Sequence, residues 1–299
     1  MLRSLRSPAV ALPAQTSDLL ARCTFPPAGV DVACAVSGGA DSLALLVLAV
    51  AAGCRVTAIH VDHGLRPGSA AEAHVVAAAA SRFGAAFRAE RVDLDPGPNL
   101  EARARAARYG VLPPGVLTGH TADDQAETVL LNLLRGAGLD GLAGMAPGPN
   151  HPLLALRRAE THRLCADLGL DPVEDPSNAD PAFRRNRVRA ELVPLLEAIA
   201  ARDPVPVLAR QAALLRTEAD LLDALAAELD PTDARSLAAA HPALARRAVR
   251  RWLTPGQAHP PDLATVDRVL AVARNESAAT DVGDGRRVAR TQGRLRLED

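Results

Sequence analysis

Short apolar runs alternate with longer segments of helical periodicity along the first two hundred residues. The run 30–36 (VDVACAV) carries β-branched residues between turn residues, which is typical of a buried parallel strand. Similar runs predict strands at 55–61, near 87–92 and near 115–119, with helices at 41–52, 69–83, near 99–109 and at 123–134. Because parallel strands need long crossover connections, this alternation predicts an α/β fold with a doubly wound parallel sheet.

The pattern changes in the second part of the chain. Glycine and proline dominate 136–152, which is predicted to be a loop, and helices are predicted near 158–168 and at 187–200. Leu- and Ala-rich helical segments then fill 206–228, 242–253 and 262–274, and Gly-centred turns in 279–297 predict a small hairpin. We therefore expect a larger α/β domain over residues 1–205 and a smaller, mainly helical C-terminal domain over residues 206–299.

Charge limits how this chain could bind nucleic acid. The net charge is −1, so any RNA contact must use local arginine patches. All 34 basic residues are arginines, which excludes a catalytic lysine. Residues 241–299 carry eleven arginines against seven acidic residues and are the better candidate for RNA contact, although a charged stretch is usually a solvated face.

Cysteine usage and the N-terminus bear on the compartment. The cysteines Cys23, Cys34, Cys54 and Cys165 form no CxxC pair, so neither a zinc ribbon nor a redox dithiol is indicated. The first fifteen residues lack the apolar stretch of a signal peptide, and no apolar run approaches the roughly 20 residues of a membrane span. We expect a cytoplasmic protein that does not enter the membrane.

A glycine-rich loop follows the first predicted strand and opens the first predicted helix. Two glycines let the backbone approach an anion closely, and the amides of a helix start favour negative charge. Asp41 would repel a bare phosphate, so its presence argues for a bridging Mg²⁺. The spacing and lysine of a Walker A loop are missing, and the alternative is an ordinary turn that caps a helix. The candidate phosphate loop consists of Ser37, Gly38, Gly39, Ala40, Asp41 and Ser42.

A polar segment follows the fourth predicted strand and enters a helix. His120, Asp124 and Glu127 recur at i, i+4 and i+7, so they would share one face if the turn is helical. A histidine and two carboxylates on one side suit metal binding or proton transfer. The alternative is an acidic first turn that the helix dipole favours.

Two arginine-containing segments are candidates for anion contact. Arg105 and Arg108 share a predicted helix face with Glu101, which could also be a plain surface ion pair. The segment FRRNRVR (183–189) places four arginines in six positions, which cannot all pair internally, so an anion is expected there. Arginine contacts to phosphate would position RNA without reading its sequence.

Several of these segments resemble one enzyme family. The SGGADS loop is similar to the SGGxDS signature of PP-loop ATP-pyrophosphatases. Three further segments resemble tRNA(Ile)-lysidine synthases: HVDHGLR (60–66), GHTADDQAET (119–128), and the motif formed by Arg185, Asn186 and Arg189 before Pro194. The resemblance covers 30–200 well and is weaker after 205, which implies a short member with a reduced C-terminal region. His151 stands where the family usually has arginine.

The resemblance implies a reaction and roles for these residues. Such an enzyme binds ATP in the phosphate loop, adenylates C2 of the wobble cytidine of the CAU-anticodon tRNA(Ile), and lets L-lysine displace AMP. It implies that Asp41 and Asp124 bind Mg²⁺, that Arg105 and Arg185 position phosphates, and that Glu127 or His120 is the base. The implied tRNA contacts are Arg108, Arg185, Asn186 and Arg189. Whether the protein forms a homodimer is left open.

Three other functions compete with this interpretation. A PP-loop tRNA thiolase that acts on cytidine would need CxxC pairs, which this chain lacks. A nucleotide-activating amide ligase would leave the Arg–Asn–Arg block without a role. A non-catalytic nucleotide-binding module would not need acids at positions 41, 124 and 127, and would bind nucleotide without releasing pyrophosphate.

Overall fold

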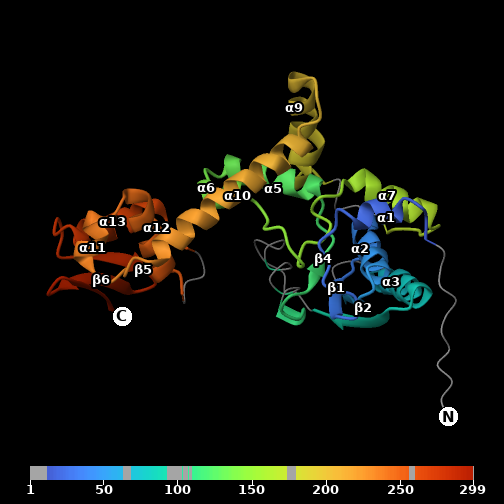
Figure 1. Cartoon of the computed structure of the whole chain (residues 1–299), viewed down its shortest axis with the longest axis horizontal. Helices are drawn as coiled ribbons and strands as arrows, with labels where there is room; N and C mark the ends of the chain where they lie inside the picture. Colours follow the sequence, from blue (N-terminus) through green and yellow to red (C-terminus); the bar gives the residue numbers. More distant parts are fainter. Residues whose placement is uncertain are drawn as a thin grey trace, which may run out of the picture. The chain divides into compact units, whose positions relative to one another are not determined.

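The computed structural model of the chain describes residues 12–62, 69–92, 103, 107, 110–173, 180–255 and 260–298. The chain forms two compact units, residues 1–213 and 214–299. The long helix α10 (Val205–Ala227) contributes residues to both units (Figure 1). The predicted domain boundary, after residue 205, lies at the start of this helix, whereas the two compact units divide after residue 213, inside it.

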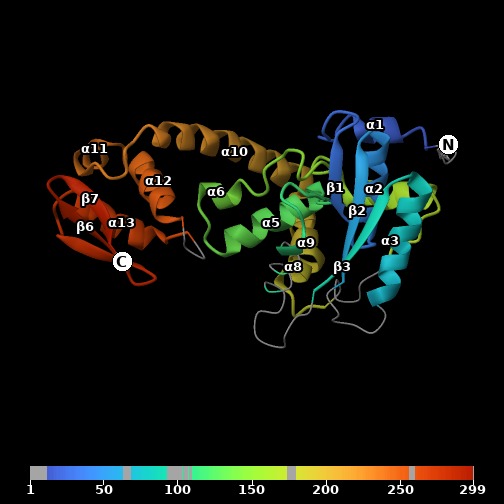
Figure 2. The ribbon, with the colours of Figure 1, turned by 90° about the horizontal axis from the view of Figure 1, so that it is seen from below.

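A parallel sheet lies at the centre of the first unit. Its strands are β1 (Asp31–Ala35), β2 (Arg55–Asp62), β3 (Ala86–Arg91) and β4 (Leu117–Thr118), in the order β3-β2-β1-β4. Figure 2 shows β1, β2 and β3 side by side. Cys34 of β1 lies opposite Ala58 of β2 and Leu117 of β4, and every strand pair is parallel. The predicted doubly wound α/β fold is confirmed.

Alternate residues of the inner strand β1 pack on opposite faces of the sheet, whereas the edge strand β3 is mostly exposed. Val32 and Cys34 of β1 face the main core, where they meet α2 (Ala40–Ala51), α3 (Ser69–Phe83) and α7 (Arg158–Asp167). Their neighbours Ala33 and Ala35 face a second cluster. Residues 43–49 of α2 are fully buried, which explains why that helix reads as apolar all round. A short helix, α1 (Thr16–Leu20), packs on this core through Leu19.

Three helical segments of the first unit pack away from that core. They are α5 (Ala122–Leu134), the pair α8 (Arg184–Arg187) and α9 (Val193–Ala200), and α6 (Leu139–Leu142), which occupies part of the predicted loop. A π-helical turn, η2 (Val188–Leu192), joins α8 to α9. Pro194 cannot donate an N–H and its ring crowds the carbonyl four residues back, so a wider turn before it relieves both problems.

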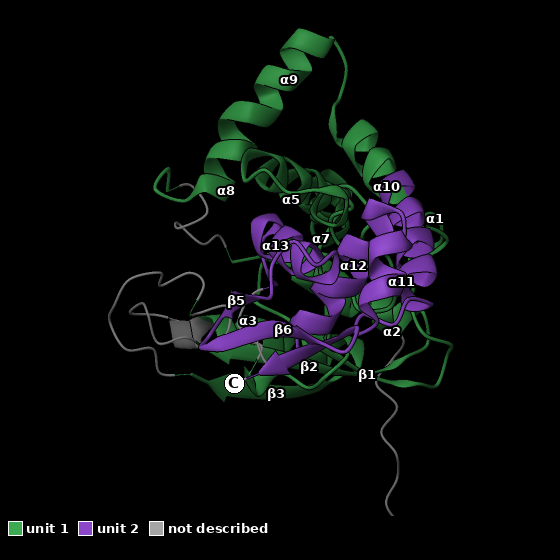
Figure 3. Cartoon of the chain, turned by 90° about the vertical axis from the view of Figure 1, so that its left-hand side faces the viewer, with its two compact units in different colours: residues 1–213 green, residues 214–299 purple. Residues whose placement is uncertain are grey.

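The second unit combines helices with a small antiparallel sheet (Figure 3). Its helices are α11 (Ala234–Ala239), α12 (Pro242–Leu253) and α13 (Leu263–Ala273), and its strands are β5 (Ala279–Gly283), β6 (Arg286–Thr291) and β7 (Arg294–Glu298). The structure has three strands where the sequence predicted a hairpin of two, because the chain turns again at Gln292 and Gly293 and continues into β7. Both turn residues have φ above zero, as a tight hairpin turn requires.

None of the helices in the described ranges is long and apolar enough to cross a bilayer. The helix predicted near 99–109 falls almost entirely outside the described residues.

Candidate nucleotide and metal site

The phosphate loop lies at the carboxyl end of β1, where ligands bind in open parallel sheets. Gly38 has φ +95°, a conformation that glycine adopts without strain. The Ser42 hydroxyl accepts hydrogen bonds from the Ser37 and Gly38 amides at 3.1 and 3.2 Å and donates to the Gly39 carbonyl at 2.8 Å. Ser42 therefore shapes the loop from inside. The Ser42 and Leu43 amides donate to the Gly39 carbonyl at 3.1 and 3.0 Å, so the amides of Ala40 and Asp41 are the ones that the start of α2 offers to an anion.

Two residues outside the loop hold it in place. His60 is 2% exposed and lies at the end of β2, with its Nδ1 3.0 Å from the Val36 carbonyl just before the loop. Gly119 follows β4, and a Cβ atom at this position would lie 2.6 Å from the backbone oxygen of Asp41. Only glycine allows this approach, which brings the segment after β4 against the start of α2. Sequence reasoning gave Gly119 no such role.

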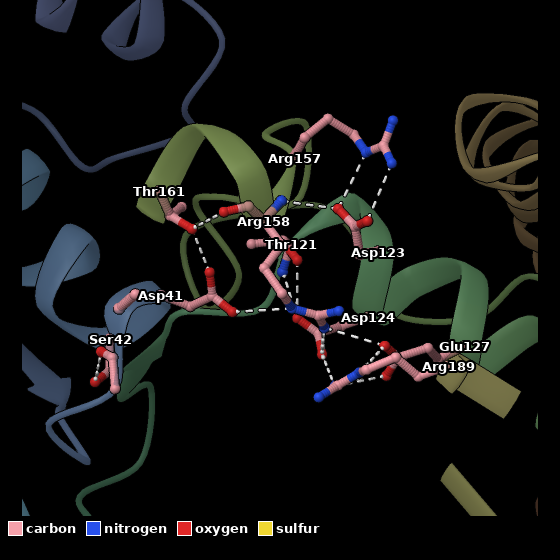
Figure 4. Close-up of polar contacts among 12 residues, drawn as sticks. Asp41, Ser42, Thr121, Asp123, Asp124, Glu127, Arg157, Arg158, Thr161 and Arg189 are labelled. Carbon is pink, nitrogen blue, oxygen red and sulfur yellow. Dashed lines mark hydrogen bonds and ion pairs between the residues drawn. The ribbon is translucent and has the colours of Figure 1, made fainter. Parts of the chain in front are cut away.

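Asp41 and Asp124 are oriented in the same way, each by a threonine that binds one carboxylate oxygen (Figure 4). The Thr161 hydroxyl of α7 donates to Asp41 Oδ1. Asp124 Oδ2 accepts from the Thr121 amide at 2.9 Å and from the Thr121 hydroxyl at 3.0 Å, which caps α5. The other oxygen of each carboxylate is left to face a common neighbour.

That neighbour is Arg158, in the first turn of α7. Its Nε lies 3.5 Å from Asp41 Oδ2, and one terminal nitrogen lies 3.0 Å from Asp124 Oδ1 and 3.1 Å from Glu127 Oε1. One guanidinium therefore connects the phosphate loop to α5 (Figure 4). Sequence reasoning missed both Arg158 and Thr161, because partners more than a hundred residues away from Asp41 leave no spacing signal.

Glu127 is the most deeply buried acid of the site, at 2% exposed. Its Oε2 accepts from Arg185 Nε at 2.8 Å, and its Oε1 accepts from Arg189 Nε at 2.7 Å. Arg185 and Arg189 also lie 3.5 and 3.8 Å from Asp124. Together with Arg158, three guanidiniums neutralise three carboxylates.

The arginine block is thus more engaged than its sequence suggested. Arg187 pairs with Glu191 one turn later, and Asn186 donates to the Asp180 carbonyl at 2.9 Å. Of the four arginines, Arg184 alone makes no ion pair within the described residues. The premise that unpaired charge in this block demands an external anion is therefore corrected for three of its four arginines.

The two aspartates differ in their acidity. Burial and the charge of Asp124 raise the pKa of Asp41, although the Thr161 hydroxyl and Arg158 act in the opposite direction. Burial also acts to raise the pKa of Asp124, but Arg158, the Thr121 amide and Arg185 outweigh it and lower that pKa. Asp124 is therefore held as a carboxylate, whereas ionised Asp41 lacks sufficient compensation.

His120 does not share a helix face with Asp124 and Glu127, because α5 begins only at Ala122. The proposed i, i+4, i+7 stripe is corrected to the pair Asp124 and Glu127. The Nδ1 atoms of His120 and His151 each lie 2.8 Å from the Thr118 hydroxyl and 3.2 Å from one another. The histidine at 151 thus belongs to a cluster at the end of β4.

Two predicted site residues, Arg105 and Arg108, lie outside the described residues. The described part of the chain forms no group of three or more His, Cys, Asp or Glu side chains suited to a metal ion. A two-carboxylate set still fits Mg²⁺, which usually binds proteins through one or two carboxylates and completes its shell with substrate phosphates and water. Asp41 and Asp124, each with one oxygen turned to the Arg158 guanidinium, form such a set.

Comparison with known proteins defines the class first. Residues 15–196 match the PP-loop domain family. The fold is similar to that of a U34-tRNA thiolase from Methanococcus maripaludis, with a TM-score of 0.55 and 17% identity over 68% of this chain and 78% of that one. The protein is therefore a PP-loop protein with the fold of the ATP-pyrophosphatases.

Sequence relatives identify the family within this class. The chain is 46% identical over 296 residues to a tRNA(Ile)-lysidine synthase from Nocardia farcinica (strain IFM 10152), covering 91% of this chain and 93% of the relative. It is 47% identical over 240 residues to one from Mycolicibacterium paratuberculosis (strain ATCC BAA-968 / K-10), covering 75% and 74%. The chain belongs to the tRNA(Ile)-lysidine synthase family.

Proposed function

We propose that this enzyme ligates L-lysine to C2 of the wobble cytidine of the tRNA(Ile) that carries a CAU anticodon, with ATP cleaved to AMP and pyrophosphate. The observation that carries the proposal is the pair of oriented carboxylates, Asp41 and Asp124, beside the phosphate loop of a chain 46% identical to a tRNA(Ile)-lysidine synthase. ATP use follows from the PP-loop family, and tRNA(Ile) is the substrate that the relatives' name states.

The reaction has two displacements. The cytidine O2 attacks the α-phosphorus of ATP, the bond to the β-phosphate oxygen breaks, and pyrophosphate leaves. The lysine amine then attacks C2, the C2–O bond breaks, and AMP leaves while the amine loses a proton. Asp41 and Asp124 would hold Mg²⁺, which when bound neutralises charge on the departing phosphates. Arg185, which lies 3.5 Å from Asp124, is proposed to position phosphates.

His120 is the better candidate for the base that takes the amine proton. Both oxygens of Glu127 accept hydrogen bonds from arginines, and its side chain is almost fully buried. His120 is partly exposed at the carboxyl end of β4, on the ligand-binding edge of the sheet.

The tRNA is proposed to contact both units. In the first, Arg108, Arg185, Asn186 and Arg189 remain the proposed contacts. In the second, an open cleft of roughly 650 Å³ lies between α11, the end of α13 and the β6–β7 turn. Arg235, Arg274 and Arg290 line it without an acidic residue, which favours a phosphate backbone as its occupant.

Assembly and location are part of the proposal. A homodimer is supported by Leu195 and Ile199, which are 54% and 73% exposed on α9. Light scattering of the wild type and of an Ile199→Glu variant tests it, because a dimer through α9 should dissociate in the variant. A cytoplasmic location is supported by the free thiols of all four cysteines.

Labelled lysine tests the activity directly. Purified protein should incorporate it into the CAU-anticodon tRNA only with ATP and Mg²⁺, and release AMP in equal amount. Incorporation without ATP would exclude the mechanism. A thiolase would instead incorporate sulfur and need cysteines gathered around a cluster. Within the described ranges, which include all four cysteines, no such group forms.

A further inference from the structure

We propose that Arg158 is a built-in counter-ion that occupies the Mg²⁺ position in the nucleotide-free enzyme and moves to the phosphates of ATP when the metal and nucleotide bind. The inference rests on the metal site of the proposed function. It assigns to Arg158 a coupling between metal and nucleotide binding that neither carboxylate could provide by itself.

The geometry of the carboxylate oxygens carries the first step. Thr161 engages Asp41 through Oδ1, and Thr121 engages Asp124 through Oδ2. The remaining oxygens, Asp41 Oδ2 and Asp124 Oδ1, both lie against the Arg158 guanidinium at 3.5 and 3.0 Å. Two oriented carboxylate oxygens around one cation are what a divalent ion would use, so the guanidinium and Mg²⁺ compete for the same two atoms.

Arg158 is distinguished from the other two arginines by Asp41. Arg185 and Arg189 contact Glu127 and Asp124, whereas among the described residues the arginine that pairs with Asp41 is Arg158. The side chain of Arg158 is 21% exposed, so it is neither locked in the core nor free in solvent. If the Arg158 side chain moves away, Asp124 and Glu127 keep their contacts with Arg185 and Arg189, and Mg²⁺ takes the place of Arg158 beside Asp41.

Charge balance explains why the exchange should require ATP. The three carboxylates and three guanidiniums of the nucleotide-free site are neutral together, so Mg²⁺ alone must break ion pairs without offering a new partner to the displaced guanidinium. ATP brings phosphates that accept it, and bidentate arginine–phosphate pairs are strong. Metal and nucleotide should therefore bind with positive coupling.

Binding of Mn²⁺ to the whole protein, followed by electron paramagnetic resonance of the free ion, tests this without any turnover. We expect Arg158→Met to bind Mn²⁺ about tenfold more tightly than the wild type in the absence of nucleotide, a size typical of coupling between two ligands. With α,β-methylene-ATP present, both proteins should gain Mn²⁺ affinity from the phosphates as ligands, and the wild type should gain more than Arg158→Met, because in the variant no guanidinium moves from the metal position to those phosphates.

Matched variants separate this from a structural effect. Arg157→Met removes the neighbouring arginine, which pairs with Asp123 and Asp203, and should leave both Mn²⁺ affinities unchanged. Arg158→Lys keeps a cation and should behave closer to the wild type. If Arg158→Met does not fold, Arg158→Gln removes the charge while keeping hydrogen-bond donors.

Two outcomes would overturn different claims. Equal Mn²⁺ affinity in the wild type and the Asp41→Asn/Asp124→Asn double variant would refute the metal site of the proposed function. If those carboxylates do hold Mn²⁺ but Arg158→Met and Arg158→Gln bind it no more tightly than the wild type, the counter-ion exchange is wrong and the proposed function stands.

Discussion

At the scale of single residues, Asp41 and Asp124 look equivalent in sequence, but the pKa of Asp41 is raised and the pKa of Asp124 is lowered. We expect Asp41→Asn and Asp124→Asn each to reduce pyrophosphate release by roughly a hundredfold or more, because each would remove a carboxylate that holds the Mg²⁺ proposed to neutralise the leaving group. Their melting temperatures should move in opposite directions by a few degrees. Asp41→Asn should raise it, because ionised Asp41 is the unfavourable state, whereas Asp124→Asn should lower it.

The pH dependence of these shifts follows from the direction of each pKa change. The raised pKa of Asp41 means that the folded protein binds its proton more tightly than the unfolded chain does. The advantage of Asp41→Asn should therefore shrink as the pH falls through that raised pKa. The stabilisation by Asp124 is present above its unfolded pKa of about 3.9 and is lost as the pH falls through the lower folded value. Thermal unfolding followed from about pH 8 down to about pH 2, on both sides of the unfolded carboxyl pKa of about 3.9, measures both. Melting shifts of the same sign in both variants at neutral pH would contradict this assignment.

Gly119 provides a steric test of how the phosphate loop is held. A Cβ at this position would meet the Asp41 carbonyl at 2.6 Å, so Gly119→Ala must displace the start of α2. We expect a loss of ATP affinity together with about 1–3 kcal/mol of stability, as for overpacking elsewhere. Gly138→Ala is the matched control, because a Cβ there meets nothing within 4 Å. Isothermal titration with ATP compares them, and unchanged affinity in Gly119→Ala would contradict the account.

Candidate site residues that stand in a local sequence motif could be proposed from the sequence. Residues that reach the site through contacts distant in sequence could not. Asp41, Asp124 and Glu127 stand in motifs beside strand ends, so sequence alone indicated them. Arg158 and Thr161 lie in an ordinary amphipathic helix, and only the folding of α7 onto α2 places them beside Asp41. Site residues supplied across the core therefore need a structure.

At the scale of elements, the strands and helices of the sheet were predicted to within one or two residues, because apolar periodicity determines them. The errors lie where local chemistry overrides periodicity. Thr121 caps α5, so the turn that carries His120 is not helical, which was the condition for His120 to share a face with Asp124 and Glu127. Pro194 sits in a run of good helix formers, and the run consequently contains the π-helical turn η2 rather than one uniform helix.

Two arginines of the segment α8–η2 differ in their contacts, so their alanine variants should differ in stability. Arg189 binds nearly buried Glu127, so Arg189→Ala should destabilise the protein by about 1.5–3 kcal/mol, the range for hydrogen bonds to a charged group, while Arg158 and Arg185 keep their contacts to Glu127. Arg184→Ala should leave stability unchanged, because Arg184 is exposed and makes no ion pair within the described ranges. Chemical denaturation measures both. Equal stability of the two variants would show that the Glu127 contacts contribute nothing.

At the scale of the whole molecule, the sequence predicted two domains but not the arginine-lined cleft of the second one. Its net positive charge could have been a solvated face. Folding instead brings Arg235 of α11, Arg274 after α13 and Arg290 of β6 around one cleft, from positions up to 55 residues apart. These three arginines meet because the sheet has three strands, whereas the sequence pattern predicted only a hairpin.

This cleft leads to a prediction about tRNA that does not depend on how the units are placed. An Arg235→Ala/Arg274→Ala double variant should bind tRNA more weakly, and the slope of log affinity against log salt should fall by about one for each phosphate that the variant no longer neutralises. ATP-dependent Mn²⁺ binding, which belongs to the first unit, should not change. Arg246→Ala serves as the control, because Asp267 already compensates Arg246 at 2.7 Å in the same unit. Filter binding over a series of salt concentrations gives the slopes. A double variant with the slope of the wild type would remove the cleft from the tRNA-binding surface and leave that role to the arginines of the first unit.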